Sequence, residues 1–277
     1  AISTQGRVIT IDGLTQVGNA GGSITTTGIG NSNPTGANIR FLSTSSLSGV
    51  GTLTLDSGSV GLINAANSIN MGGGITIQNS GGATFSNPVT AGAVDIISTT
   101  SGKDVSFNGT LNAASLNTGS GAYNLNVISG GTITGATNIT NTGTTTLGND
   151  QFDVLTFIGG LTANSGPLNL AGTIATSNSG TITIGDATLT ASTNLRSQSG
   201  VITTGALSGG SQILSLQNNL STGGVIFGGN LNVGQLVTAP GNYAVTLNGN
   251  SNLVSFASPT VFNNLGSVTF GANSASS

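Results

Sequence analysis

A short phrase of apolar residues and glycine recurs along the chain. Its clearest copies are Val105-Ser-Phe107-Asn-Gly109-Thr-Leu111, Leu155-Thr-Phe157-Ile-Gly159-Gly-Leu161, Leu168-Asn-Leu170-Ala-Gly172-Thr-Ile174 and Val225-Ile-Phe227-Gly-Gly229-Asn-Leu231. Each copy has the alternating apolar pattern of a short β-strand, then a glycine corner, then the start of another strand. One such unit cannot bury its apolar side chains alone, whereas stacked copies can. The repeat therefore predicts a solenoid whose coils share one core.

The spacing of the large apolar residue before each corner indicates the length of one coil. Large apolar residues recur in two series, and successive members of each series are roughly 20–23 residues apart. This period matches one coil of a parallel β-helix with three short strands and three corners. The series are Phe85, Phe107, Val127, Leu147 and Leu170, and then Phe227, Leu247 and Phe270. We expect these residues to form the stacked core. Phe157 follows Leu147 by about half of this period, which indicates another face of the coil, and Ile184 and Leu216 do not fall in phase.

Four glycines follow the large apolar residue of their copy by two positions, namely Gly109, Gly159, Gly172 and Gly229. We expect them at the corners, because several tight bends of a β-helix need a positive φ, which glycine and asparagine reach at low cost. Asparagine side chains stacked in successive coils are also expected to form hydrogen-bonded ladders along the axis.

The composition favours an all-β fold over a helical or a disordered chain. Glu is absent and Lys103 is the one lysine, so there is little material for solvated helical faces. Although 46 residues are glycine, 36% of the chain is hydrophobic, and Ile75-Thr-Ile77 is typical of its alternating phrases. Disordered linkers do not place Ile and Leu at a period of two.

The length predicts one elongated domain over residues 1–277. At roughly 22 residues per coil and ~4.8 Å per stacked strand, the chain makes about 12 coils and a rod of roughly 60 Å. Residues 1–45 include a glycine-rich stretch over residues 18–36. We expect this part to form irregular or longer-looped first coils.

The chain has little material for catalysis. It contains no His, Cys or Glu, which excludes Ser/His and Cys/His nucleophilic catalysis and imidazole metal ligands. Among seven aspartates, Asp150 and Asp153 are close in sequence, and they read either as a calcium or paired-acid fragment or, as we favour, as a polar corner before a strand. We therefore predict a protein that is not an enzyme, with no cofactor and no metal site.

Charge and hydropathy argue against two kinds of partner. The formal net charge is −3 with four basic residues, which leaves no basic stripe for nucleic acid. No stretch of 18 consecutive apolar residues is present, so we expect no membrane insertion.

Several phrases resemble the repeat region of filamentous-haemagglutinin-type exoproteins of Gram-negative bacteria. Examples are Gly-Thr-Ile-Thr-Gly at residues 131–135, Gly143-Thr-Thr-Thr-Leu147 and the segment at residues 161–174. The resemblance implies a right-handed parallel β-helix, exported by two-partner secretion or as an autotransporter passenger, and located at the cell surface or outside the cell. The family's secretion domain carries an Asn-Pro-Asn motif, which Asn33-Pro34-Thr35 matches in part. The chain is thus expected to be shaft rather than an export element.

The leading hypothesis is a non-enzymatic, extracellular structural or adhesive rod, such as a matrix fibre subunit or an adhesin shaft. Its expected partners are a second copy stacked end to end, neighbouring coils of a longer chain, or a host or matrix glycan or protein surface. One alternative is an ice-binding β-helix, suggested by threonines at residues 25–27 and 144–146, although the threonine ladder does not repeat at every coil. Another is glycan binding through asparagine and the two tyrosines, Tyr123 and Tyr243.

Overall fold

The computed structural model describes residues 1–217, 222–248 and 254–271, and it is a β-solenoid of about 12 turns with parallel stacked coils. The one helical element in these residues is a 3₁₀ turn, η1 (Ile29–Asn31). The predicted all-β solenoid and its number of coils are confirmed. Right-handedness stays a prediction.

The chain forms two compact units. Unit 1 comprises residues 1–133 and 140–145, and unit 2 comprises residues 134–139 and 146–277. Strand β17 (Thr145–Leu147) contributes its first residue to unit 1 and the other two to unit 2. Organisation as a single domain over residues 1–277 stays a prediction.

Three stacks of parallel strands build unit 1. Stack A contains β1 (Ile2–Ser3), β4 (Gly22–Thr25), β7 (Thr52–Asp56) and the C-terminal parts of β9 (Ile69–Asn79), β11 (Val89–Ile96) and β13 (Leu111–Thr118). Stack B contains β2 (Ile9–Ile11), β5 (Ile39–Phe41), β8 (Ile63–Ala65), β10 (Ala83–Phe85), β12 (Asp104–Phe107) and β14 (Asn124–Val127). Stack C contains β3 (Leu14–Val17), β6 (Ser46–Gly49), the N-terminal parts of β9, β11 and β13, and β15 (Gly131–Ile133).

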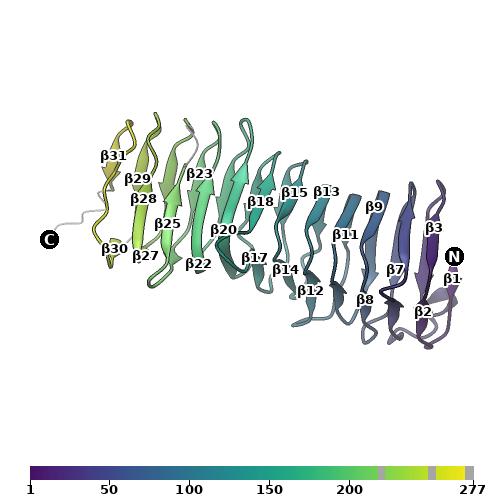
Figure 1. Ribbon diagram of the computed structural model, residues 1–277. Coiled ribbons are helices and arrows are strands. Elements are labelled where there is room, and N and C mark those ends of the chain that lie inside the picture. Colours follow the sequence, from purple (N-terminus) through teal and green to yellow (C-terminus); the bar gives the residue numbers. More distant parts are fainter. Residues whose placement is uncertain (218–221, 249–253, 272–277) are drawn as a thin grey trace. The chain divides into compact units, whose positions relative to one another are not determined.

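Unit 2 repeats this arrangement with its own three stacks. Stack D contains β16 (Thr137–Ile139), β19 (Leu161–Ala163), β21 (Ile182–Ile184), β23 (Ile202–Thr204), β26 (Val225–Phe227), β29 (Val245–Leu247) and β31 (Val268–Phe270). Stack E contains the N-terminal parts of β20 (Leu168–Thr176) and β22 (Ala187–Arg196), then β24 (Leu207–Ser208), β27 (Leu231–Val233) and β30 (Val254–Phe256). Stack F contains β18 (Val154–Phe157), the C-terminal parts of β20 and β22, β25 (Ile213–Leu216) and β28 (Gln235–Thr238). Within each unit, strands of successive coils lie side by side in Figure 1.

Register within the stacks gives the coil length directly. In stack B, Ile39 pairs with Ile63 and Ile63 with Ala83, so one coil returns to the same stack within the period predicted from the repeat or slightly beyond it. The first pairing of that stack, Ile9 with Ile39, is a longer step, and the added residues include η1. The first coil therefore carries longer loops than the coils that follow it.

Alternation along each strand separates the core from the surface. In β12, Val105 and Phe107 are buried, whereas Asp104 is exposed and Ser106 is half-buried. Parallel sheets are usually covered on both faces and read as continuous apolar runs. In these coils one side of each sheet faces solvent, so the sequence alternates with a period of two.

Small residues let one strand turn from one stack to the next. Strand β9 bends at residues 72–74, all glycine, and β20 bends at Ala171-Gly172. Gly172 has φ +71° at this bend, and a Cβ there would lie 2.3 Å from the Asp153 carbonyl oxygen. Only glycine satisfies both the backbone angle and the close approach.

Candidate functional site

Most of the repeat residues lie in the interior. Phe85, Phe107 and Val127 are in register on stack B, and the rings of Phe85 and Phe107 stack with centroids 4.9 Å apart. The other buried residues of the predicted core are Leu147, Phe157, Leu170, Phe227 and Leu247. Fully burying side chains of this size stabilises a fold by about 1.5–3 kcal/mol each, so these rows are a main source of stability.

Phe270 differs from the prediction, because its side chain is 63% exposed. It is in register with Leu247 through the pairing of β31 with β29. Among the described residues, β31 has no strand on its other side, so no further coil covers the ring. The repeat pattern predicted the register of Phe270 correctly but its burial wrongly.

The three unit 2 copies of the phrase lie on three different stacks. Phe157 is on stack F, Leu170 on stack E and Phe227 on stack D. Ile184 is in phase after all, because it pairs with Thr204, which pairs with Phe227. The sequence pattern missed this row because the buried slot between Ile184 and Phe227 holds a threonine.

The four corner glycines have two different physical roles. Gly172 has a positive φ, as expected at a corner, but Gly109, Gly159 and Gly229 do not. A Cβ on Gly109 would lie 2.3 Å from the Asn87 carbonyl carbon of the preceding coil, and Gly159 and Gly229 approach backbone atoms about as closely. At these three corners glycine is needed for coil-to-coil contact, so the expectation of unusual backbone angles is wrong there.

Asparagine side chains link successive coils through hydrogen bonds to neighbouring backbone and aspartate groups. Asn87 Nδ2 donates to the Ala66 carbonyl at 2.8 Å, and Asn141 and Asn264 donate to the carbonyls of the buried Tyr123 and Tyr243. Asn117 and Asn124 donate to aspartates one coil earlier in unit 1. Among the described residues, these asparagines bond to backbone and aspartate groups rather than to other asparagines, which differs from the ladders predicted from composition.

All seven aspartates accept hydrogen bonds that hold the backbone or neighbouring coils. Five of them bond across coils: Asp12 with Thr44, Asp56 with Thr27, Asp95 with Asn117, Asp104 with Asn124, and Asp186 with the Ala206 amide. Asp150 and Asp153 accept the backbone amides of Asn149, Asp150 and Phe152 and thereby close the turn before β18. The described residues contain no group of three or more His, Cys, Asp or Glu that could hold a metal ion.

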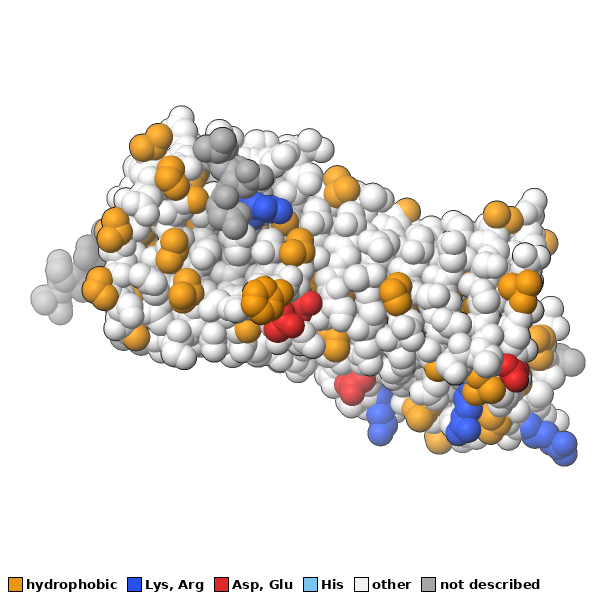
Figure 2. Space-filling model, in the orientation of Figure 1, with side chains coloured by type: hydrophobic (Ala, Val, Ile, Leu, Met, Phe, Trp, Pro, Cys, Tyr) orange, Lys and Arg blue, Asp and Glu red, His pale blue; other side chains and the backbone are white. Residues whose placement is uncertain are grey.

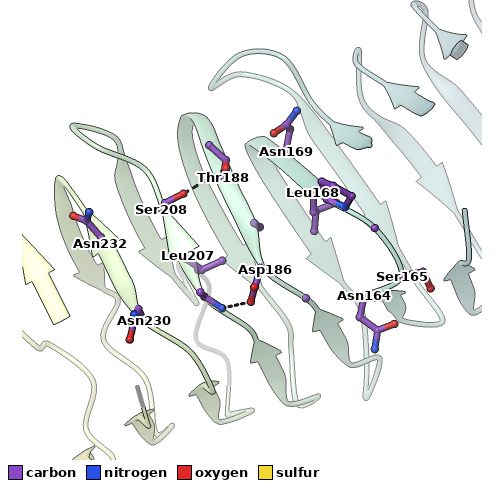
Figure 3. Close-up of a pocket in the computed structure, with 15 residues that line it drawn as sticks. Asn164, Ser165, Leu168, Asn169, Asp186, Thr188, Leu207, Ser208, Asn230 and Asn232 are labelled. Atoms are coloured by element: carbon purple, nitrogen blue, oxygen red, sulfur yellow. Dashed lines mark hydrogen bonds between the residues drawn. The ribbon is translucent and has the colours of Figure 1, made fainter. Parts of the chain in front are cut away.

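A groove runs across stack E. It has a volume of about 820 Å³ and is lined by residues of β20, β22, β24 and β27 together with the corners before them. Asn169, Thr188, Ser208 and Asn232 occupy equivalent positions of four successive coils, and Figure 3 shows them on neighbouring strands. The Thr188 and Ser208 hydroxyl oxygens are 3.4 Å apart. The groove therefore presents hydroxyl and amide groups at the spacing of the coils, about 4.8 Å.

A second row supports the floor of this groove. Asn164, Asp186 and Asn230 lie at the corners before the strands, and the Ala206 amide donates to Asp186 Oδ1 at 2.8 Å. Asp186 is the one charged residue of the lining. Sequence reasoning missed the groove, because polar positions spaced one coil apart carry no signal in a chain rich in Ser, Thr and Asn.

The two tyrosines are buried rather than displayed. Burial raises the pKa of Tyr123 to about 12, against a smaller lowering by Thr118 and the Gly119 backbone, and burial also raises the pKa of Tyr243. Both side chains are almost fully covered. They cannot form the ligand platform that the glycan-binding alternative assigned to them.

In the described part of the chain, no helix is long and apolar enough to span a bilayer. No match was found to a protein-family model, to a curated protein or to a solved structure.

Proposed function

We propose that this protein is a non-enzymatic, extracellular structural or adhesive solenoid of the filamentous-haemagglutinin type, acting at the surface of a Gram-negative bacterium. One observation carries the proposal: every aspartate of the chain is bound in a hydrogen bond that stabilises a turn or a coil. Catalytic carboxylates need to face a substrate instead. The absence of His, Cys and Glu from the sequence and the resemblance of its repeats support the same function.

The surface supports an adhesive role through uncharged contacts. Figure 2 shows a face on which uncharged polar side chains and backbone predominate, with few charged groups. Hydroxyl and amide groups of this kind bind other polar surfaces with little dependence on ionic strength.

The test is the location of the protein on the cells that produce it. Proteinase K added to intact cells is expected to degrade it, while a cytoplasmic marker stays intact. Deleting the gene is expected to reduce attachment of the cells to a matrix-coated surface, with unchanged growth. Full protection of the protein in intact cells would contradict the proposal.

End-to-end association is part of the proposal. In unit 1, Ile2 is 44% exposed although its register partner Ile24 is buried, and in unit 2, Phe270 is 63% exposed although its partner Leu247 is buried. Another coil, from a second copy or from neighbouring parts of a longer chain, would cover such residues. We expect the sedimentation coefficient of the purified protein to rise with concentration and Phe270→Asp to suppress the rise. A constant monomer value at all concentrations rules out self-association.

The groove on stack E favours glycan binding as a second candidate function. Its rows of Asn, Thr and Ser repeat once per coil, which suits a neutral polymer lying along the axis. Replacing Thr188 and Ser208 by valine is expected to abolish retention of the protein on the polysaccharide that it binds. Retention unchanged by both substitutions would exclude the groove.

A further inference from the structure

A second, smaller hollow lies on the outer side of stack F and shares no residue with the stack E groove. Its volume is about 330 Å³. The turn at Gln151-Phe152 contributes two lining residues, and residues of β20, β22, β25 and β28 together with Ala239 form the rest. None of the lining residues is charged, so the hollow suits a small neutral molecule.

Asn194 is the unusual residue of this hollow. It is in register with Thr173 and Ser215 on the outer side of the stack, yet it is only 9% exposed. Neither its Nδ2 nor its Oδ1 has a hydrogen-bond partner. Buried amides are almost always bonded, because leaving one unbonded costs its full desolvation. An amide held here without partners is therefore ready to bond with a ligand that brings a donor and an acceptor side by side.

Phe152 gives the hollow an aromatic rim. The Phe152 amide donates to Asp150 Oδ1 at 2.7 Å, and Asp153 Oδ2 accepts the amides of Asn149 and Asp150, so the backbone of the turn is fixed. The ring itself is 80% exposed and is not held by packing. Exposing a phenyl ring costs free energy unless a partner covers it. The amide atoms of Asn194 are screened from solvent, so binding requires a side chain that lines the hollow to move aside.

We propose that this hollow binds a neutral pyranose through a pair of vicinal hydroxyl groups. Two adjacent hydroxyls present a donor and an acceptor at a separation that matches the two atoms of the Asn194 amide. The C–H face of a sugar ring stacks on an exposed aromatic ring, and Phe152 supplies one. Thr173, Ser192 and Ser215 add hydroxyl groups around the same space. The inference extends the second candidate function to a separate site, and it is tested by different residues.

The experiment titrates the full chain with methyl glucoside, methyl galactoside and methyl mannoside, followed by calorimetry and by saturation-transfer NMR. Methyl 3-deoxyglucoside, which has no vicinal hydroxyl pair, is the matched control ligand. Phe152→Ala and Asn194→Leu are the site variants. Val60→Ala, at another exposed apolar residue, is the control variant, and Asn232→Leu reports separately on the stack E groove.

We expect at least one methyl pyranoside to bind with a dissociation constant on the order of 1 mM. Each site variant is expected to weaken binding at least ~10-fold, whereas Val60→Ala and the wild type bind alike. Phe152→Ala keeps the test decisive if Asn194→Leu fails to fold, because the ring is exposed. The proposal is overturned if no pyranoside binds, if the 3-deoxy sugar binds equally well, or if Phe152→Ala binds like the wild type. Equal loss in Asn232→Leu would assign the binding to the stack E groove and overturn this site as well.

Discussion

At the scale of single residues, the two buried tyrosines show how similar positions in the two units differ in hydrogen bonding. Tyr243 donates its hydroxyl to the Ala239 carbonyl at 2.9 Å. The Tyr123 hydroxyl is buried without a hydrogen bond of ordinary geometry. In both cases an asparagine of the next coil donates to the tyrosine carbonyl, so the backbone contact is the same and only the hydroxyl differs.

This difference predicts unequal results for two matched substitutions. Tyr243→Phe loses a buried hydrogen bond and is expected to lower the free energy of unfolding by about 1 kcal/mol. Tyr123→Phe removes a hydroxyl that makes no hydrogen bond of ordinary geometry, and it is expected to lower stability less than Tyr243→Phe or to leave it unchanged. Urea unfolding at pH 7 measures both. A larger loss in Tyr123→Phe than in Tyr243→Phe would contradict the hydrogen-bond assignment.

The raised pKa of Tyr123 predicts a loss of stability in alkali. Its ordinary pKa of 10.0 applies in the unfolded chain, whereas burial raises the pKa to about 12 in the folded protein. The unfolded state therefore loses its proton first, so this contribution is intact below about pH 10 and is lost as the pH rises toward 12. We expect a fall of about 1.4 kcal/mol per pH unit in that window.

Tyr123→Phe serves as the control for this pH dependence. Unfolding of the variant is expected to depend less steeply on pH between about 10 and 12, because Tyr243 is then the one tyrosine that titrates. Tyrosinate absorbance of the folded wild type is expected to appear at a higher pH than that of the unfolded chain. Identical pH profiles of the wild type and the variant would contradict the burial of the Tyr123 hydroxyl.

At the scale of strands and corners, close contact between the backbones of successive coils determines which residues the corners can hold. Gly109 lies against the backbone of Asn87 and Pro88 in the preceding coil, where a Cβ would be 2.3–2.4 Å from backbone atoms. Gly18 is a glycine in the same unit with open space around its Cβ position and no positive φ. The two residues are a matched pair for measuring the cost of separating two corners.

Gly109→Ala is expected to lower the free energy of unfolding by about 1–3 kcal/mol, because the added methyl group forces two backbones apart. Gly18→Ala is expected to leave stability unchanged or to raise it by up to about 1 kcal/mol. Thermal and urea unfolding of the two variants provide the comparison. Equal effects would show that the corner contact is looser than described.

The sequence predicted this level of structure in part. Strand alternation and coil length follow from local pattern, so the stacking of Phe85 on Phe107 was predictable from the period of the repeat. The register between Ile184 and Phe227 was not predictable, because Thr204 occupies a core position at which the pattern expects an apolar residue. The grooves were also beyond reach, because they depend on which polar residues meet across coils.

At the scale of the whole molecule, charge contributes little to stability or to recognition. Charged residues make up 4% of the chain, and its aspartates bond mainly to neutral groups. Hydrogen bonds and apolar burial carry the fold in both units.

The low charge predicts a stability that is nearly independent of salt. Between 0.05 and 1 M NaCl, the free energy of unfolding is expected to change by less than about 0.5 kcal/mol, because few charges are present to be screened. Urea unfolding across this range tests it. A large loss of stability at high salt would reveal ion pairs that hold the fold.

The central claim is that successive coils stack in parallel register, and distances between spin labels test it most directly. The chain has no native cysteine, so paired labels can be placed cleanly. The label positions are equivalent residues of successive strands in stack B of unit 1: Thr10, Arg40, Asn64, Thr84, Ser106 and Asn126. With one label fixed at Asn126, pulsed electron paramagnetic resonance should give about 19 Å to Arg40 and about 24 Å to Thr10, an increment of ~4.8 Å per coil. Distances that do not increase by a constant step, or that are spread broadly, would contradict the stacked solenoid.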